Sequence, residues 1–213
     1  NKKLTNLRYV IFGGEALNTY RLKSWFDNDI AAHALLINMY GITETTVHVT
    51  YKPITISDVN YNASIGKIIP DLRAYILDNN LVPMPIGAIG ELYVGGEGVA
   101  RGYLNKPELT KERFIDNPFR TEEEKKLNKN GRLYKTGDLG RWLADGNIEY
   151  IGRNDFQVKI RGYRIELGEI ENALNEYPLI KQGIVIAKAH KDIDGNESEN
   201  KYLVGYYVTE NGV

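Results

Sequence analysis

The chain has 213 residues, a formal net charge of −1 and no cysteine. A balanced charge without a basic stripe argues against a nucleic-acid partner, and no apolar run approaches the ~18 residues of a membrane span. Without cysteine there is neither a disulfide framework nor a thiolate metal site, which fits a cytoplasmic setting. The first residue is Asn and strand-like segments lie near both ends, so we expect a piece of a larger protein.

The N-terminal part is predicted to form a β-α-β unit. Residues 7–12 form an apolar, β-rich run that ends at a glycine pair, and residues 35–40 form a second such run. Between them, apolar positions spaced for one helical face predict a helix over residues 15–26. This order indicates part of a parallel sheet, with function expected at the carboxyl ends of its strands.

From about Ile65 the pattern changes to short strands separated by turns, which predicts a small barrel-like unit. The expected strands are residues 72–77, 90–94, 141–143 and 148–151, with one helix over residues 107–114 that starts at Pro107. The charged run at residues 122–130 is predicted to be a solvated loop. Beyond a boundary near residues 153–155 we expect a small α+β unit, with strands at 156–160, 180–187 and 202–208 and a helix over 167–177. The predicted class is therefore mixed α/β.

Two polar segments follow the N-terminal strands. Gly13 and Gly14, followed by Glu15, let backbone approach a ligand at a helix N-terminus, although a plain strand-to-helix turn has the same composition. Residues 38–44 (NMYGITE) combine an amide, an aromatic ring, hydroxyls and a carboxylate. Such a set can bind the edge of a base, stack on it and hold a hydrated Mg²⁺, but a strand end with a polar turn remains an alternative.

The second half carries further candidates. Asp138, beside Gly137, offers two carboxylate oxygens that can accept from the hydroxyls of a ribose, or it is simply an Asp in a turn. Arg153 and Lys159 can bind phosphate or carboxylate oxygens, or can be surface charges. His48 has no second His or acid at a spacing typical of a metal site or a catalytic triad.

Four segments, in this order, carry a resemblance to a known family. They are NMYGITET (38–45), GELYVGGEGVARGYLNKPELTKERFIDNPF (90–119), YKTGDLGRW (134–142) and GRNDFQVKIRGYRIELGEIE (152–171). The chain resembles the adenylation domains of non-ribosomal peptide synthetases, within the acyl-adenylate-forming superfamily. One departure is Ile42, where the family usually has proline, and we expect only a small change of backbone there.

The resemblance implies activation of an amino acid by ATP and its transfer to the phosphopantetheine thiol of a carrier protein. Residues 1–153 would be the C-terminal part of the large AMP-binding domain, and residues 154–213 the first part of a small mobile domain. By the resemblance, Asn38 would face the adenine amino group, and Tyr40 would stack on the ring. Thr43 would contact phosphate, and Glu44 would help to hold Mg²⁺. Asp138 would bind the ribose hydroxyls.

Further roles carry over at other positions. Tyr150 and Arg153 would lie near the nucleotide, as would Gly14 and Glu15 after the first strand. Asp155 would be the hinge of the small domain, and Lys159 would approach the active site in the thiolation state.

The family's specificity pocket matches five positions of this sequence: Ile11, Gly13, Met39, Val47 and His48. Their order is similar to the family's pattern for threonine. Gly13 leaves room, apolar side chains can pack a methyl group, and His48 can hydrogen-bond a hydroxyl. The resemblance therefore predicts L-threonine as substrate.

The family's Ser/Thr/Gly-rich phosphate loop and the aspartate that pairs with the substrate ammonium would precede Asn1, and its adenylation lysine would follow Val213. We therefore expect this chain to be inactive alone. Two alternatives stay open: an acyl-CoA ligase, and a non-catalytic nucleotide-binding module.

Overall fold

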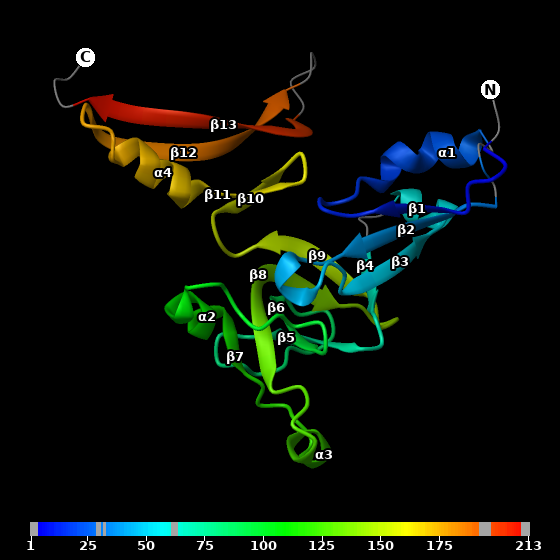
Figure 1. Cartoon of the computed structure of the whole chain (residues 1–213). Helices are drawn as coiled ribbons and strands as arrows, with labels where there is room; N and C mark the ends of the chain where they lie inside the picture. The colour runs from blue at the N-terminus through cyan, green and yellow to red at the C-terminus, as the bar shows by residue number, and fades with distance from the viewer. Residues whose placement is uncertain (1–3, 29–30, 32, 61–63, 192–196, 210–213) are drawn as a thin grey trace. The chain divides into compact units, whose positions relative to one another are not determined.

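A computed structural model describes residues 4–28, 31, 33–60, 64–191 and 197–209 (Figure 1). The chain divides into two compact units, Asn1–Asn154 and Asp155–Val213. The division falls one residue past the predicted domain boundary.

The first unit is built on one mixed sheet of nine strands, ordered β1-β2-β3-β4-β9-β8-β6-β5, with β7 paired to β8. β1 and β2 are parallel, as predicted, and the other pairs are antiparallel. In the described residues this path is open from β1 to β5, so the predicted barrel-like closure is not confirmed. The strands are β1 (Tyr9–Phe12), β2 (Leu35–Tyr40), β3 (Thr50–Ile54), β4 (Ser64–Ile68), β5 (Leu72–Leu77), β6 (Gly90–Gly96), β7 (Phe114–Asp116), β8 (Arg132–Trp142) and β9 (Ile148–Arg153).

Short helices connect these strands. The helix predicted over residues 15–26 is shorter than expected: it begins as the 3₁₀ turn η1 (Thr19–Leu22), where the side chain of Asn18 accepts from Tyr20 N, and continues as α1 (Lys23–Asp27). Two more 3₁₀ turns are η2 (Thr43–Thr45) and η3 (Ile56–Asn60). Helix α2 (Pro107–Arg113) lies where proline predicted it.

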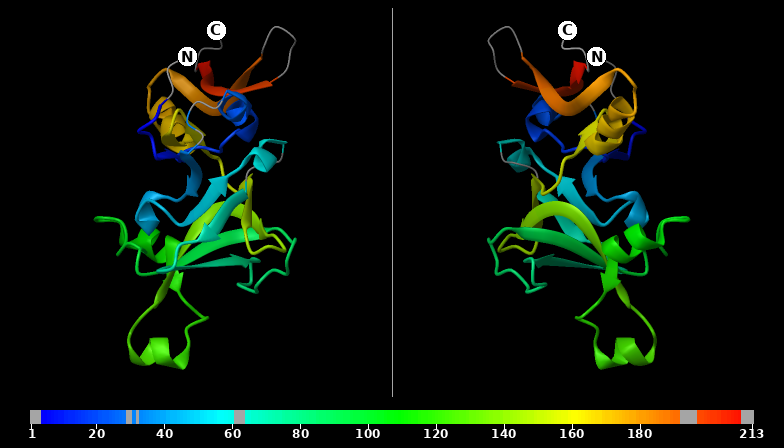
Figure 2. Two further views of the ribbon diagram at one scale, coloured as in Figure 1. Left: turned by 90° about the vertical axis from the view of Figure 1, so that its right-hand side faces the viewer. Right: turned by 90° about the vertical axis from the view of Figure 1, so that its left-hand side faces the viewer.

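The prediction of a plain loop at residues 122–130 was wrong. Helix α3 (Glu122–Lys126) forms there, at the tip of the connection between β7 and β8 (Figure 2). Thr121 and Glu124 form a capping box, and the acidic first turn and basic last turn complement the helix dipole. These local signals suffice for one exposed turn of helix.

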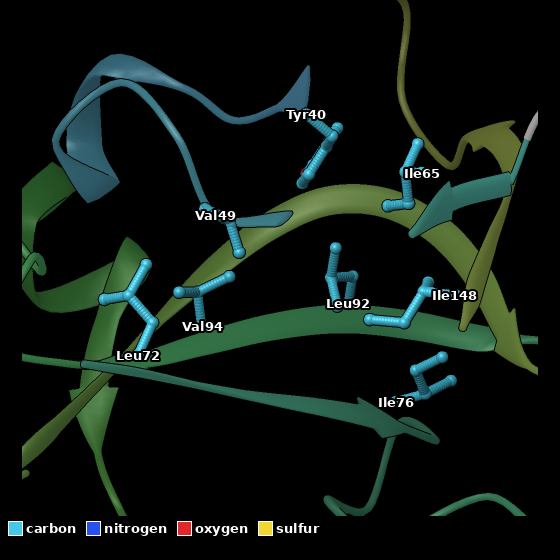
Figure 3. Packing of buried hydrophobic residues seen from close by; sticks show 8 residues of the cluster. All are labelled: Tyr40, Val49, Ile65, Leu72, Ile76, Leu92, Val94 and Ile148. Carbon is cyan, nitrogen blue, oxygen red and sulfur yellow. The ribbon is translucent and has the colours of Figure 1, made fainter. Parts of the chain in front are cut away.

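The main core lies under the centre of the sheet. Its buried members come from β2, β4, β5, β6, β9 and the segment before β3, and they pack on one another in Figure 3: Tyr40, Val49, Ile65, Leu72, Ile76, Leu92, Val94 and Ile148. Strand β6 is buried along nearly its whole length, whereas β2 alternates between buried and more exposed positions. The core thus anchors β2, which leads into the polar segment after it, and β9, which pairs with the strand that carries Asp138.

The second unit contains two hairpins and a helix. β10 (Gln157–Ile160) pairs with β11 (Tyr163–Glu166) through a two-residue turn, in which Arg161 and Gly162 both have positive φ, as a type I′ turn requires. Helix α4 (Leu167–Asn175) follows, and β12 (Ile180–Lys191) then pairs with β13 (Glu197–Thr209). The predicted strands and helix are present, and both strands of the last hairpin are longer than expected.

Candidate functional site

The ends of β1 and β2 meet at one edge of the sheet. Phe12 lies opposite Asn38 in the parallel register, so the residues that follow both strands are neighbours. A Cβ atom at Gly13 would lie 3.3 Å from the carbonyl oxygen of Met39 and 3.8 Å from Cε1 of His48. Three of the five predicted pocket residues therefore adjoin one another, and a side chain at position 13 would crowd them.

The turn after β2 has an unusual backbone. Gly41 is required by close approach, because a Cβ there would overlap the carbonyl oxygen of Val47. Thr46 and Val47 have φ of 58° and 72°, although β-branched residues rarely adopt positive φ. Such strain is typical of functional turns. It leaves Val47 exposed, as is Ile11 on β1.

His48 follows this strained pair and is half-buried. Its Nδ1 atom is buried and has no hydrogen-bond partner among the residues that the structure describes. Buried polar atoms are nearly always paired, so an unpaired ring nitrogen makes His48 a candidate for a hydrogen bond to a ligand.

Two side chains predicted to meet a base come from the end of β2. Asn38 is buried, and its Nδ2 donates to the carbonyl oxygen of Ser64 at 3.2 Å. This bond engages the amide nitrogen, and the amide oxygen of the same group is the acceptor that a base amino group would require. Tyr40 is also buried, with its ring 6.3 Å from that of Tyr150, and it is part of the main core.

Asp138 lies on β8, is 1% exposed, and both of its carboxylate oxygens accept hydrogen bonds. Tyr40 donates its hydroxyl to Oδ2 at 2.5 Å, and Arg153, opposite on β9, donates Nη1 to Oδ1 at 2.9 Å. Burial, and then the Asp138 charge, raise the pKa of Tyr40 well above its ordinary value, so the phenol stays a donor. The predicted nucleotide residues Tyr40, Asp138 and Arg153 therefore form one network.

Asp138 thus lies within a strand and not in a turn, and the stretch of β8 that carries it is held from the neighbouring strand β6. The hydroxyl of Thr136 donates to the carbonyl oxygen of Leu92 at 2.7 Å and accepts from Asp138 N at 2.9 Å. Gly137 N donates to Oε1 of buried Glu91 at 2.9 Å. Glu91 also contributes, after burial, to raising the pKa of Tyr93 to about 12.

Glu44, in η2, is 7% exposed and is held by two phenols. Tyr103 donates its hydroxyl to Oε1 at 2.7 Å, and Tyr134 on β8 donates to the same atom at 3.0 Å. Burial, and then these neighbours, raise the pKa of Tyr103. Sequence reasoning did not select either tyrosine, although both lie within motifs that it quoted.

Comparisons with known proteins agree with this geometry. The family described as "AMP-binding enzyme" matches residues 1–104. Malpinin synthetase of Mortierella alpina is 50% identical over 97% of this chain and 2% of its own length, and a dimodular nonribosomal peptide synthase of Bacillus subtilis is 49% identical over 93% and 8%. The solved structure of PA1221, an NRPS protein containing adenylation and PCP domains, superposes with a TM-score of 0.79 at 27% identity, covering 99% of this chain and 40% of that one. The chain belongs to the adenylation domains of non-ribosomal peptide synthetases.

This adenylation-domain chain spans only a small part of the curated relatives it matches. In the described part of the chain, no helix is long and apolar enough to cross a membrane.

The predicted Mg²⁺ ligand of the adenylation domain is Glu44. The described residues contain no group of three or more His, Cys, Asp or Glu side chains that could hold a metal ion. A single carboxylate nevertheless fits Mg²⁺, which is commonly held by one or two carboxylates together with substrate phosphates and water.

The remaining predicted residues are three in the first unit and two in the second. Gly14, Glu15 and Thr43 are exposed. In the second unit, Asp155 accepts from Gln157 N at 3.1 Å and lines a groove of about 560 Å³ beside α4 and β12, and Lys159 lies on β10. The thiolation role of Lys159 stays a prediction.

Proposed function

We propose that the protein carrying this chain activates an amino acid with ATP and transfers it to the phosphopantetheine thiol of a carrier domain. The substrate carboxylate attacks the α-phosphorus, an acyl–phosphate bond forms, and the bond to the β-phosphate breaks to release pyrophosphate. The thiol sulfur then attacks the acyl carbon, and AMP leaves. The observation that carries the proposal is the buried network of Tyr40, Asp138 and Arg153 at the edge where β2 ends.

In this proposal the nucleotide lies along that edge. Asn38 offers an amide oxygen to the adenine amino group, and Tyr40 and Tyr150 supply aromatic surface beside it. The ribose hydroxyls share the carboxylate of Asp138 with Tyr40 and Arg153; an ionised carboxylate has about four acceptor positions. Mg²⁺ bound at Glu44 would neutralise phosphate charge, and adenylation depends mainly on such charge stabilisation and on positioning.

The amino acid that we propose is L-threonine. The absence of a side chain at Gly13 leaves space next to Met39 and His48, and the unpartnered Nδ1 of His48 supplies a polar atom for a hydroxyl. A pocket that bonds a substrate hydroxyl discriminates strongly against the analogue lacking it, because its own polar atom is then left unpaired.

Amino-acid-dependent pyrophosphate exchange by the full-length protein tests both parts. We expect exchange with L-threonine to exceed exchange with L-valine, its isostere without the hydroxyl. His48→Leu should lower the rate with threonine more than the rate with valine, and so reduce the preference for threonine. A clear preference of the unaltered protein for valine or phenylalanine would exclude threonine, and ATP binding without exchange for any amino acid would instead favour a non-catalytic nucleotide-binding module.

We also propose that Asp155 is the hinge of the small unit, which the division of the chain at Asn154/Asp155 supports. PA1221 contains a PCP domain beside its adenylation domain, which supports a carrier partner here. The 213 residues contain neither the family's phosphate loop nor its adenylation lysine, so the chain alone should give no exchange above background.

A further inference from the structure

The longest motif of the sequence, residues 90–119, supplies none of the predicted site residues, yet it supplies one of the two phenols on Glu44. We propose that Tyr103 and Tyr134 are positioning residues that fix the carboxylate of Glu44 for the metal–phosphate group. The inference rests on the proposed function, because it assumes that Glu44 holds the cation.

The contacts around Glu44 form a closed triangle. Both hydroxyls reach Oε1, at 2.7 and 3.0 Å, and the two hydroxyl oxygens are 3.0 Å apart. Two phenol hydrogens cannot serve three sides of a triangle, and a carboxylate only accepts. When both phenols donate to Glu44, the contact between their two oxygens carries no hydrogen, and two donors from different segments of the chain hold Oε1 in place.

The phenols are themselves held by aromatic packing. The ring of Phe114 lies edge-on to Tyr103 at 5.5 Å and tilted against Tyr134 at 4.9 Å. Phe114 and Tyr134 are buried together with Ile42, two residues before Glu44. This packing restrains the two rings, and with them the positions of their phenol oxygens beside the carboxylate.

The backbone that carries Tyr103 is fixed by its own motif. Tyr103 N donates to the hydroxyl of Thr110 at 2.9 Å, which in turn donates to the carbonyl oxygen of Lys106 at 2.8 Å. Gly102 has φ of +144°, and a Cβ there would overlap Cγ2 of Thr110. Upstream, Ala100 N donates to the carbonyl oxygen of Glu44 at 2.9 Å. The residues of the motif thus place one phenol beside one carboxylate.

The arrangement differs from a salt bridge in what it supplies. A phenol orients a carboxylate by a neutral hydrogen bond, without adding positive charge of its own. Groups that orient metal ligands typically change metal affinity or activity by about 10-fold to 100-fold when removed.

The test uses Tyr103→Phe and Tyr134→Phe in the full-length protein. Both retain the ring on Phe114 and lose only the hydroxyl. Tyr75→Phe is the matched control, because Tyr75 stacks on Phe119 at 4.7 Å and packs against a different hydrophobic cluster from that of Phe114 and Tyr134. Two quantities are measured: the Mg²⁺ concentration for half-maximal pyrophosphate exchange, and Mn²⁺ affinity in the presence of a non-hydrolysable ATP analogue, followed by electron paramagnetic resonance without turnover.

In each phenol variant we expect the half-maximal Mg²⁺ concentration to rise about tenfold and the Mn²⁺ affinity to fall about tenfold. ATP affinity in the absence of metal should not change, and Tyr75→Phe should behave as the unaltered protein. Values within twofold of the unaltered protein for Tyr103→Phe would overturn the inference. Should Tyr134→Phe not fold, as a thermal melt would reveal, the half-buried Tyr103 decides alone.

Glu44→Gln separates this inference from the proposed function. Loss of Mn²⁺ binding in Glu44→Gln with normal phenol variants would leave the metal role of Glu44 standing and overturn only the positioning role. Normal Mn²⁺ binding in Glu44→Gln would overturn both.

Discussion

Asp138 and Glu44 are both buried carboxylates near the end of β2, but they are held by different chemistry. Asp138 pairs with the guanidinium of Arg153 and accepts from one phenol, whereas Glu44 accepts from two phenols. A guanidinium neutralises the carboxylate that it orients, and a phenol orients without neutralising. We therefore expect loss of the charged donor beside Asp138 to cost stability, and loss of a phenol beside Glu44 to cost orientation of the carboxylate.

The largest effect is expected where the charge is removed from beside Asp138. Arg153→Met leaves a buried carboxylate without its cation, and the side chains of this pair are only 9% and 2% exposed. Breaking such a pair costs about 3 kcal/mol of unfolding free energy, measured by urea denaturation of the chain.

Arg141→Met is the matched control for this change. Arg141 also joins β8 to β9, through Glu149 at 2.5 Å, but its side chain is 39% exposed. Its loss should cost less than about 1 kcal/mol. Equal costs for the two variants would show that the Asp138 pair is no more important than a surface pair.

A smaller effect is expected from the support behind Asp138. Glu91→Ala removes the acceptor of Gly137 N in a buried site, which should cost about 2 kcal/mol. Glu91→Gln keeps an acceptor oxygen and should cost clearly less. Urea denaturation measures both free energies of unfolding. An equal loss of stability in the two variants would indicate that the charge of Glu91, and not its hydrogen bond, holds this stretch of β8.

Much of the first unit could be predicted from the sequence because its signals are local. The apolar run at residues 35–40 and the turn residues around 72–77 gave correct strands, and Pro107 marked the start of α2. The sheet order could not be predicted: pairs such as β4 with β9 join segments more than 80 residues apart, and strand pattern does not choose partners. The capping box at Thr121 was a local signal that the charge run concealed.

The candidate site divides in the same way. Asn38, Tyr40 and Glu44 lie within seven residues, so one motif could suggest them together. The phenols of Tyr103 and Tyr134 could not be found so easily, because they reach Glu44 from 59 and 90 residues away. A tyrosine in a motif is equally typical of a packed core. Here both rings pack in or against the cluster of Ile42 and Phe114, while both hydroxyls donate to Glu44.

The smallest effect tests the Glu44 side through the backbone of Tyr103. Thr110→Val preserves the shape of the side chain but removes the acceptor of Tyr103 N and the donor to Lys106 O, at a cost of about 1 kcal/mol. Because Tyr103 keeps its own hydroxyl, the Mg²⁺ requirement for exchange should rise less than in Tyr103→Phe. Thr110→Ser, which retains the hydroxyl, should behave as the unaltered protein. Thr110→Val could instead lose stability with no change in Mg²⁺ requirement. The two phenols would then hold Glu44 without the contacts of Thr110 to the backbone around Tyr103, and their position would depend on the packing against Phe114 alone.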